Sequence, residues 1–274
     1  MSPNVIVVSL KGATARRKRM LTLLAARGLP FVFFDAHDGR QSHVANRALA
    51  ELPNAGRLYP GELGCALSHI DVWRRIASAD GNGLTLIVED DVHLSAGFEN
   101  EWKSLARSKL PPGIYRFETM LASVNMKIAP VWTGRSCAFH PLLSAHGGTA
   151  AYALNREVAS RLVAESTKIR EAIDIELFHP LRSNIQMPNV YQAFPGQVIQ
   201  DMLLPATERS PDLVSQIVER RDLDVPELNA SSFRREYPTG LRNAGRSLRN
   251  LLISAKLRQQ GLYRRVVKFD TTVP

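Results

Sequence analysis

The sequence has few of the features that mark extracellular or membrane-spanning proteins. Only two of its 274 residues are cysteines, Cys65 and Cys137, which is too few for a disulfide framework, and no Cys/His group has zinc-site spacing. No apolar run approaches the roughly 20 residues needed to cross a bilayer, and the N-terminus shows no signal-peptide pattern. We therefore expect a protein of a reducing, cytoplasmic compartment.

The positive charge is confined to one segment. The formal net charge is +9, and ten Lys or Arg residues with a single acid lie between Phe233 and Lys268, which leaves 25 basic and 25 acidic residues elsewhere. Apolar residues of this segment recur at helical spacing: Leu241, Ala244, Leu248, Leu251, Leu252 and Ala255. Such a basic amphipathic helix is typical of an element that binds an anionic membrane surface. Packing on the body or on a second copy of the chain, as in a homo-oligomer, is the alternative. No nucleic-acid motif is present, so nucleic acid is not expected as a partner.

The apolar segments predict an α/β fold. A strand over 5–10, a helix over 14–27 that ends at Gly28, and a strand over 31–34 form a β-α-β unit, which favours a parallel strand pair. Further strands are expected near 84–88, 114–118, 147–154, 190–194 and 197–201, and further helices near 60–76, 98–107 and 156–166. We predict a catalytic domain over 1–204, a Pro-interrupted linker over 205–232 and a basic helical tail over 233–274.

An acidic triplet ends one of these strands. Glu89, Asp90 and Asp91 follow the apolar run 84–88, and the carboxyl ends of strands in open α/β sheets border the ligand crevice. Three like charges repel one another unless a cation is bound, and hard divalent cations prefer oxygen ligands and often hold substrate phosphates. Glu89 and Asp91 face the same way on an extended strand, so we expect them to bind the metal. Asp90 points oppositely and either orients the sugar or binds a helix; a solvated strand end is the alternative for the whole triplet.

Several segments in order resemble glycosyltransferase family 25, which includes lipooligosaccharide and collagen galactosyltransferases. The resemblance covers roughly residues 4–201, and residues 233–274 lie outside it. Its most specific part is the block Pro-Gly-Glu-Leu-Gly-Cys-Ala-Leu-Ser-His at 60–69, followed by the acidic strand end. The other segments are Val7 to Leu10, Phe33 to Gly39, Arg116 to Thr119 and Gly148 to Tyr152. The motif Glu89-x-Asp91 replaces a strict Asp-x-Asp.

The resemblance implies a GT-A-like (Rossmann-like) nucleotide-sugar transferase domain that uses Mn²⁺, or Mg²⁺, and inverts the sugar carbon. It implies a UDP-sugar donor, galactose or glucose, and a lipid-linked oligosaccharide acceptor of lipopolysaccharide biosynthesis. The enzyme would then act at the inner face of the cytoplasmic membrane. By the same resemblance the donor site includes Ser9, Leu10, Arg16, Asp35, Ser68 and His69.

Glycosyl transfer also needs a general base near the acceptor hydroxyl. Asp174 and Glu118 are the candidates, and either is alternatively a structural acid. Gly148 permits close backbone approach and admits the sugar or the acceptor, while His146 is a further candidate ligand for metal or phosphate. A catalytically inactive relative that acts as a glycan- or membrane-binding scaffold is the alternative to an enzyme, although the presence of both Glu89 and Asp91 favours the enzyme.

Overall fold

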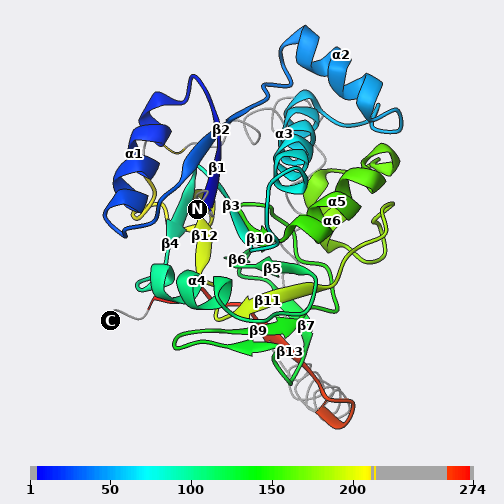
Figure 1. Ribbon diagram of the computed structural model, residues 1–274. Helices are drawn as coiled ribbons and strands as arrows, with labels where there is room; N and C mark the ends of the chain where they lie inside the picture. The colour runs from blue at the N-terminus through cyan, green and yellow to red at the C-terminus, as the bar shows by residue number, and fades with distance from the viewer. Residues whose placement is uncertain (1–4, 211–212, 214–257, 272–274) are drawn as a thin grey trace, which may run out of the picture.

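A mixed eight-stranded sheet forms the centre of the protein, in a computed structural model that describes residues 5–210, 213 and 258–271 (Figure 1). In spatial order its strands are β2 (Val32–Ala36), β1 (Val5–Leu10), β3 (Thr85–Glu89), β10 (Ala151–Leu154), β5 (Ile114–Arg116), β11 (Val190–Phe194), β9 (Ala138–Pro141) and β8 (Trp132–Thr133). β2, β1 and β3 are mutually parallel, whereas β10 is antiparallel to both β3 and β5. The predicted β-α-β opening and the buried acidic strand are thus confirmed.

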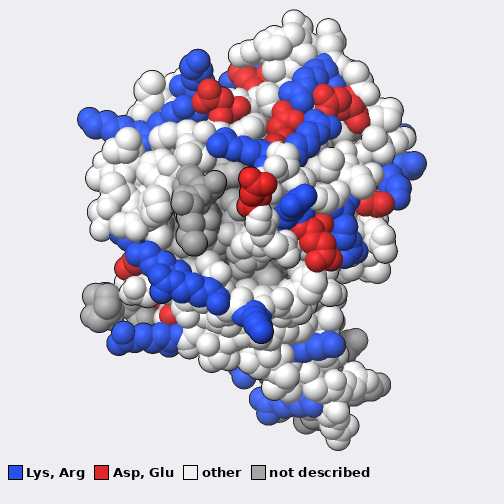
Figure 2. All heavy atoms as spheres, viewed as in Figure 1, with Lys and Arg blue, Asp and Glu red and all other residues white. Residues whose placement is uncertain are grey.

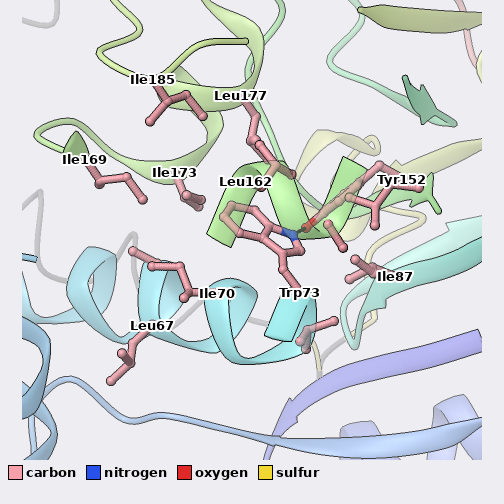
Figure 3. Packing of buried hydrophobic residues seen from close by; sticks show 14 of the residues in the cluster. Leu67, Ile70, Trp73, Ile87, Tyr152, Leu162, Ile169, Ile173, Leu177 and Ile185 are labelled. Atoms are coloured by element: carbon pink, nitrogen blue, oxygen red, sulfur yellow. Dashed lines mark hydrogen bonds between the residues drawn. The ribbon is translucent and has the colours of Figure 1, made fainter. Parts of the chain in front are cut away.

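Helices cover both faces of this sheet, and the alternation of side chains along each strand supplies both cores. On β1, Ile6 and Val8 face one core, and Val5 and Val7 face the other. The helices are α1 (Thr14–Ala25), α2 (Ser42–Glu51), α3 (Pro60–Ala77), α4 (Phe98–Ala106), α5 (Arg156–Glu165) and α6 (Ile173–Phe178). The core between the sheet and α3, α5 and α6 is centred on Trp73 (Figure 3). The predicted helices near 60–76, 98–107 and 156–166 are confirmed, while α2 lies in a stretch whose weak periodicity gave no prediction.

A second, three-stranded sheet lies at the carboxyl end of β3. Its strands are β4 (Val92–Leu94), β12 (Val198–Gln200) and β6 (Glu118–Thr119). The predicted strand 114–118 is therefore two strands, β5 and β6, that belong to different sheets. This break carries Glu118 out of the large sheet and places it beside β12, which pairs with β4 directly after the acidic triplet.

Residues 258–271 belong to the folded body, which differs from the predicted helical tail. β13 (Leu262–Val266) pairs antiparallel with β7 (Ser123–Lys127). Val267 is fully buried against β7, and the Gln197 amide donates to Asp270 at 3.2 Å. The physical reason is that Val267 and the partly buried Tyr263 pack with Val124 and Met126 of β7 in a small core, which this segment completes as a paired strand. The expected linker 205–232 and the helical stripe at 241–255 fall largely or wholly outside the described residues.

None of the helices within the described ranges has both the length and the apolar character that crossing a bilayer requires.

Candidate active site

A pocket of about 200 Å³ opens at the carboxyl ends of β1, β2 and β3. Parallel pairing sets Val8 opposite Glu89 and Ser9 opposite Asp35, so the ends of the three strands meet at one edge of the sheet. The start of α3 and the loop after β2 form the other wall. The face shown in Figure 2 is hollowed near its centre, with Lys and Arg side chains on the border. This is the expected position for a ligand crevice in an open α/β sheet.

Asp90 contacts helix α1 through Arg16 and also borders the pocket. Its carboxylate accepts a hydrogen bond from the Ser9 hydroxyl at 2.6 Å and one from Arg16 Nη1 at 3.1 Å. The bond from Arg16 holds α1 beside the pocket, and the bond from Ser9 joins the ends of β1 and β3. Ser9, Leu10, Arg16 and Asp90, which are predicted donor-site residues, all line the pocket.

Glu89 and Asp91 converge on one point, as the two-residue spacing predicts. The Gln200 side-chain nitrogen lies 3.4 Å from Glu89 Oε2 and 3.5 Å from Asp91 Oδ1. Asp91 is only 7% exposed, and burial, reinforced by repulsion from Glu89 and Asp90, raises its pKa to about 7. A divalent cation would relieve this repulsion, and the carboxylate oxygens suit a hard ion. The residues therefore fit the predicted Mn²⁺ or Mg²⁺.

A second group of possible metal ligands overlaps this one. Atoms of Cys65, His69 and Glu89 lie within 4.8 Å of one another. Burial raises the pKa of the Cys65 thiol well above its usual range, so the sulfur stays protonated at neutral pH and is a poor ligand for a hard ion. The carboxylate pair is the better site for Mn²⁺ or Mg²⁺.

The remaining donor-side candidates are placed differently from one another. The Ser68 hydroxyl donates to Gly64 O at 2.6 Å and accepts from His37 N at 2.9 Å, so it ties α3 to the loop after β2 although it borders the pocket. His69 is buried beneath Glu89, with Nε2 3.5 Å from Oε1. Asp35 is 57% exposed, pairs with Arg17 Nη2 at 2.5 Å, and does not line the pocket.

The loop 147–150 binds three carboxylates through three consecutive residues. Gly148 N donates to Asp174 at 3.0 Å, the Thr149 hydroxyl to Glu89 at 2.8 Å, and Ala150 N to Glu118 at 2.8 Å. Gly148 adopts φ +89°, which favours glycine. The loop thereby fixes Glu89, a predicted metal ligand, and both predicted base candidates relative to one another.

The two base candidates differ in accessibility. Glu118 has no exposed surface, and burial raises its pKa to about 8 despite the guanidinium of Arg116 at 3.3 Å. Arg116 is itself buried, lies over the ring of Phe178, and donates to the carbonyl oxygens of His146 and Gly147. Asp174, at the start of α6, is partly exposed. Of the two, only Asp174 presents a surface that an acceptor can touch.

His146 is engaged within the protein. Its Nε2 accepts from Met120 N at 3.1 Å, and its Nδ1 lies 3.2 Å from Gln192 Oε1. Burial lowers its pKa to about 2. Both ring nitrogens have protein partners, so the structure does not bring His146 to the pocket as a ligand.

Comparison with known proteins identifies the family. A sequence model described as "Glycosyltransferase family 25 (LPS biosynthesis protein)" matches residues 2–177. The chain belongs to glycosyltransferase family 25. This confirms the family resemblance and the enzyme class, a glycosyltransferase.

Several relatives of this family 25 glycosyltransferase are known. It is 31% identical over 209 residues to "Lacto-N-neotetraose biosynthesis glycosyltransferase LgtE" of Neisseria gonorrhoeae, with 72% of this chain and 73% of that protein covered. It is 31% identical to "Lipooligosaccharide biosynthesis protein lic2B" of Haemophilus influenzae, with 71% and 75% covered. It is also 31% identical to "Probable inactive glycosyltransferase 25 family member 3" of Bos taurus, of which it covers 32%.

Among solved structures, the inositol-1-phosphate CTP transferase from T. maritima shares 13% identity at a TM-score of 0.35, covering 78% of this chain and 93% of that chain.

Three residues around Glu89 were not assigned to the site from the sequence. Gln200 and Thr149 contact Glu89, and Tyr152 lies beneath His69. Each is far from Glu89 in sequence, and Gln200 ends an unremarkable strand. Tyr152 offered one signal: a large polar aromatic in the middle of an otherwise small, apolar strand.

Proposed function

We propose that this glycosyltransferase moves galactose or glucose from a UDP-sugar to a lipid-linked oligosaccharide in lipopolysaccharide or lipooligosaccharide biosynthesis, with inversion at the sugar carbon. The observation that carries the proposal is the convergence of Glu89 and Asp91 on one point at the edge of a strand-end pocket. The names of LgtE and lic2B support the pathway. The parallel β2–β1–β3 unit beside the antiparallel β10 supports a GT-A-like domain.

Glu89 and Asp91 would hold Mn²⁺ or Mg²⁺. When bound, this ion acts as a Lewis acid that neutralises charge on the departing UDP. The donor's nucleoside would occupy the pocket beside Ser9 and Leu10, where Arg16 approaches the phosphates; a guanidinium is well suited to phosphate oxygens. Asp90 keeps Arg16 in place through their hydrogen bond.

Asp174 is the proposed general base. It takes the proton of the acceptor hydroxyl as the acceptor oxygen bonds to the anomeric carbon and the bond to the β-phosphate oxygen breaks. Gly148 N–H and Ile175 N–H each donate to one of its oxygens and fix its orientation. Glu118, buried and bound to Ala150 N, holds the loop and does not touch the acceptor.

Donor turnover tests the metal. The full chain is incubated with UDP-galactose or UDP-glucose and Mn²⁺, and UDP release is followed with and without a lipooligosaccharide acceptor. Asp91→Asn should abolish release, whereas Asp80→Asn, in an exposed loop, should not. Full transfer in excess chelator would contradict the metal assignment. Absence of any turnover with either donor would instead favour the inactive scaffold.

Asp174→Asn tests the base. Losing a general base costs on the order of 10²-fold or more in rate, while the affinity for UDP measured by calorimetry should stay nearly unchanged. Glu171→Gln is the matched control, because Glu171 lies three residues away and pairs with Arg182 on the surface. An unchanged transfer rate in Asp174→Asn would place the base elsewhere.

A further inference from the structure

Four side chains form a row of polar contacts that runs from the apolar core to the acidic strand end. Trp73 Nε1 lies 2.9 Å from the Tyr152 hydroxyl, which lies 2.7 Å from His69 Nδ1. His69 Nε2 in turn lies 3.5 Å from Glu89 Oε1. Figure 3 shows the indole nitrogen of Trp73 turned toward Tyr152 within the hydrophobic cluster. Trp73, Tyr152 and His69 are all buried.

The chemistry of the donors sets the direction of these bonds. An indole N–H only donates, so the Tyr152 oxygen accepts from Trp73. Among the described residues, the Tyr152 hydroxyl has only one other hydrogen-bond partner, His69 Nδ1, so its proton goes there. Nδ1 is then the acceptor, and the ring proton is on Nε2, facing Glu89. The opposite tautomer would bury an unpaired hydroxyl proton and turn a lone pair toward a carboxylate, both of which are costly.

The two oxygens of Glu89 are thereby made different. Oε1 receives the Thr149 hydroxyl at 2.8 Å and faces the Nε2–H of His69. Oε2 faces Gln200 on the side of Asp91. Oε1 is held by a short bond from Thr149, whereas Oε2 has only the long bond from Gln200, which also reaches Asp91.

We propose that His69 is a positioning residue, fixed in its Nε2–H tautomer by Tyr152 and Trp73, that leaves Oε2 of Glu89 as this carboxylate's single metal ligand. The inference rests on the proposed metal-dependent function. In this proposal His69 orients Glu89, whereas the family resemblance implied that His69 contacts the UDP-sugar donor. It also excludes Cys65, His69 and Glu89 as a joint metal site, because Nε2 has no free lone pair in this tautomer.

Tyr152→Phe removes the hydroxyl and keeps the ring. Loss of such an outer hydrogen-bond partner costs on the order of 10- to 100-fold in metal affinity, so Mn²⁺ should bind that much more weakly by electron paramagnetic resonance titration of the full chain. Binding of UDP without metal should change less than about twofold. Tyr115→Phe is the control, because its hydroxyl donates to Pro111 O outside the pocket. His69→Gln, which keeps a side-chain N–H, should retain more affinity than His69→Ala.

Nitrogen-15 NMR of histidine-labelled wild-type protein reads the tautomer directly and does not depend on any variant folding. We expect a protonated Nε2 and an unprotonated Nδ1 for His69. The reverse tautomer, or Tyr152→Phe with wild-type Mn²⁺ affinity, would overturn the inference. So would tight Zn²⁺ binding that is lost in Cys65→Ser. If wild-type protein binds no Mn²⁺ at all, the proposed metal function fails. The NMR measurement still tests the tautomer of His69 independently of that result.

Discussion

Gly148→Ala should be among the most damaging single substitutions outside the hydrophobic cores. Gly148 adopts φ +89°, and a Cβ at this position would lie 2.4 Å from Glu118 Oε1 and 2.7 Å from Oε2. An L-residue in the left-handed region costs about 1–2 kcal/mol, and overpacking a buried site costs about 1–3 kcal/mol more. The expected loss in free energy of unfolding is therefore about 2–5 kcal/mol. Because Glu118 is fully buried, it has little room to move away.

A second glycine separates the two contributions. Gly81 has φ +88°, almost the same backbone conformation, but a Cβ there would meet no atom within 4 Å. Gly81→Ala should therefore lose only the conformational cost, about 1–2 kcal/mol. Urea denaturation of both variants at one pH gives the difference directly, and that difference is the cost of the contact with Glu118.

The transfer rate of Gly148→Ala should also fall, since the Gly148 and Ala150 amides hold Asp174 and Glu118. Gly81→Ala should leave the rate unchanged. Equal destabilisation by the two substitutions, together with normal transfer in Gly148→Ala, would refute the description of a loop packed against a buried carboxylate.

Three further predictions concern pH, the C-terminal strand and the basic segment. Burial raises the pKa of Glu118 from 4.5 to about 8, so the stability contributed by its neutral form is fully present below pH 4.5 and is lost as pH rises through 8. Urea denaturation at a series of pH values should show a smaller decline in the free energy of unfolding for Glu118→Gln than for the wild type. The same decline in both proteins would contradict a raised pKa for Glu118. Val267→Ala should lower the free energy of unfolding by about 1–3 kcal/mol because Val267 is fully buried. Val266 is 45% exposed, so Val266→Ala should change it by no more than about 0.5 kcal/mol. Equal losses in thermal or urea unfolding would place this segment outside the core. If segment 233–268 binds membranes, full-length protein should co-sediment with anionic vesicles at low salt and dissociate from them at high salt. Replacing the Lys and Arg residues of 234–256 by Gln should abolish this binding. Equal co-sedimentation of the two proteins would reject a membrane role.

The parts of the fold that were predictable from sequence depend on local pattern. β1, α1 and β2 follow from an apolar strand, a helix bounded by Gly28, and a second apolar strand. The convergence of Glu89 and Asp91 follows from strand geometry alone, since residues two apart face the same side. The same strand geometry predicted that Asp90 points away from Glu89 and Asp91, and the structure shows that its partners are Ser9 and Arg16.

The parts that were not predictable depend on distant segments. Nothing near Gln200 in the sequence indicates that β12 pairs beside the acidic triplet, because that pairing is fixed by the path of the whole chain. Glu118 ends the predicted strand 114–118 and was a candidate base, but after the break between β5 and β6 it is fully buried. Asp35 has the expected register position opposite Ser9, yet its side chain turns outward to Arg17.

The three carboxylates that the loop 147–150 binds should differ in how sensitive their positions are to substitutions in the loop. Asp174 and Glu118 are held by main-chain N–H groups of Gly148 and Ala150, which side-chain substitution does not remove. Glu89 is held by the Thr149 hydroxyl, which a single codon change deletes. On the proposed function, changes at position 149 that preserve its backbone therefore alter cation affinity, while the main-chain groups that hold Asp174 and Glu118 stay in place.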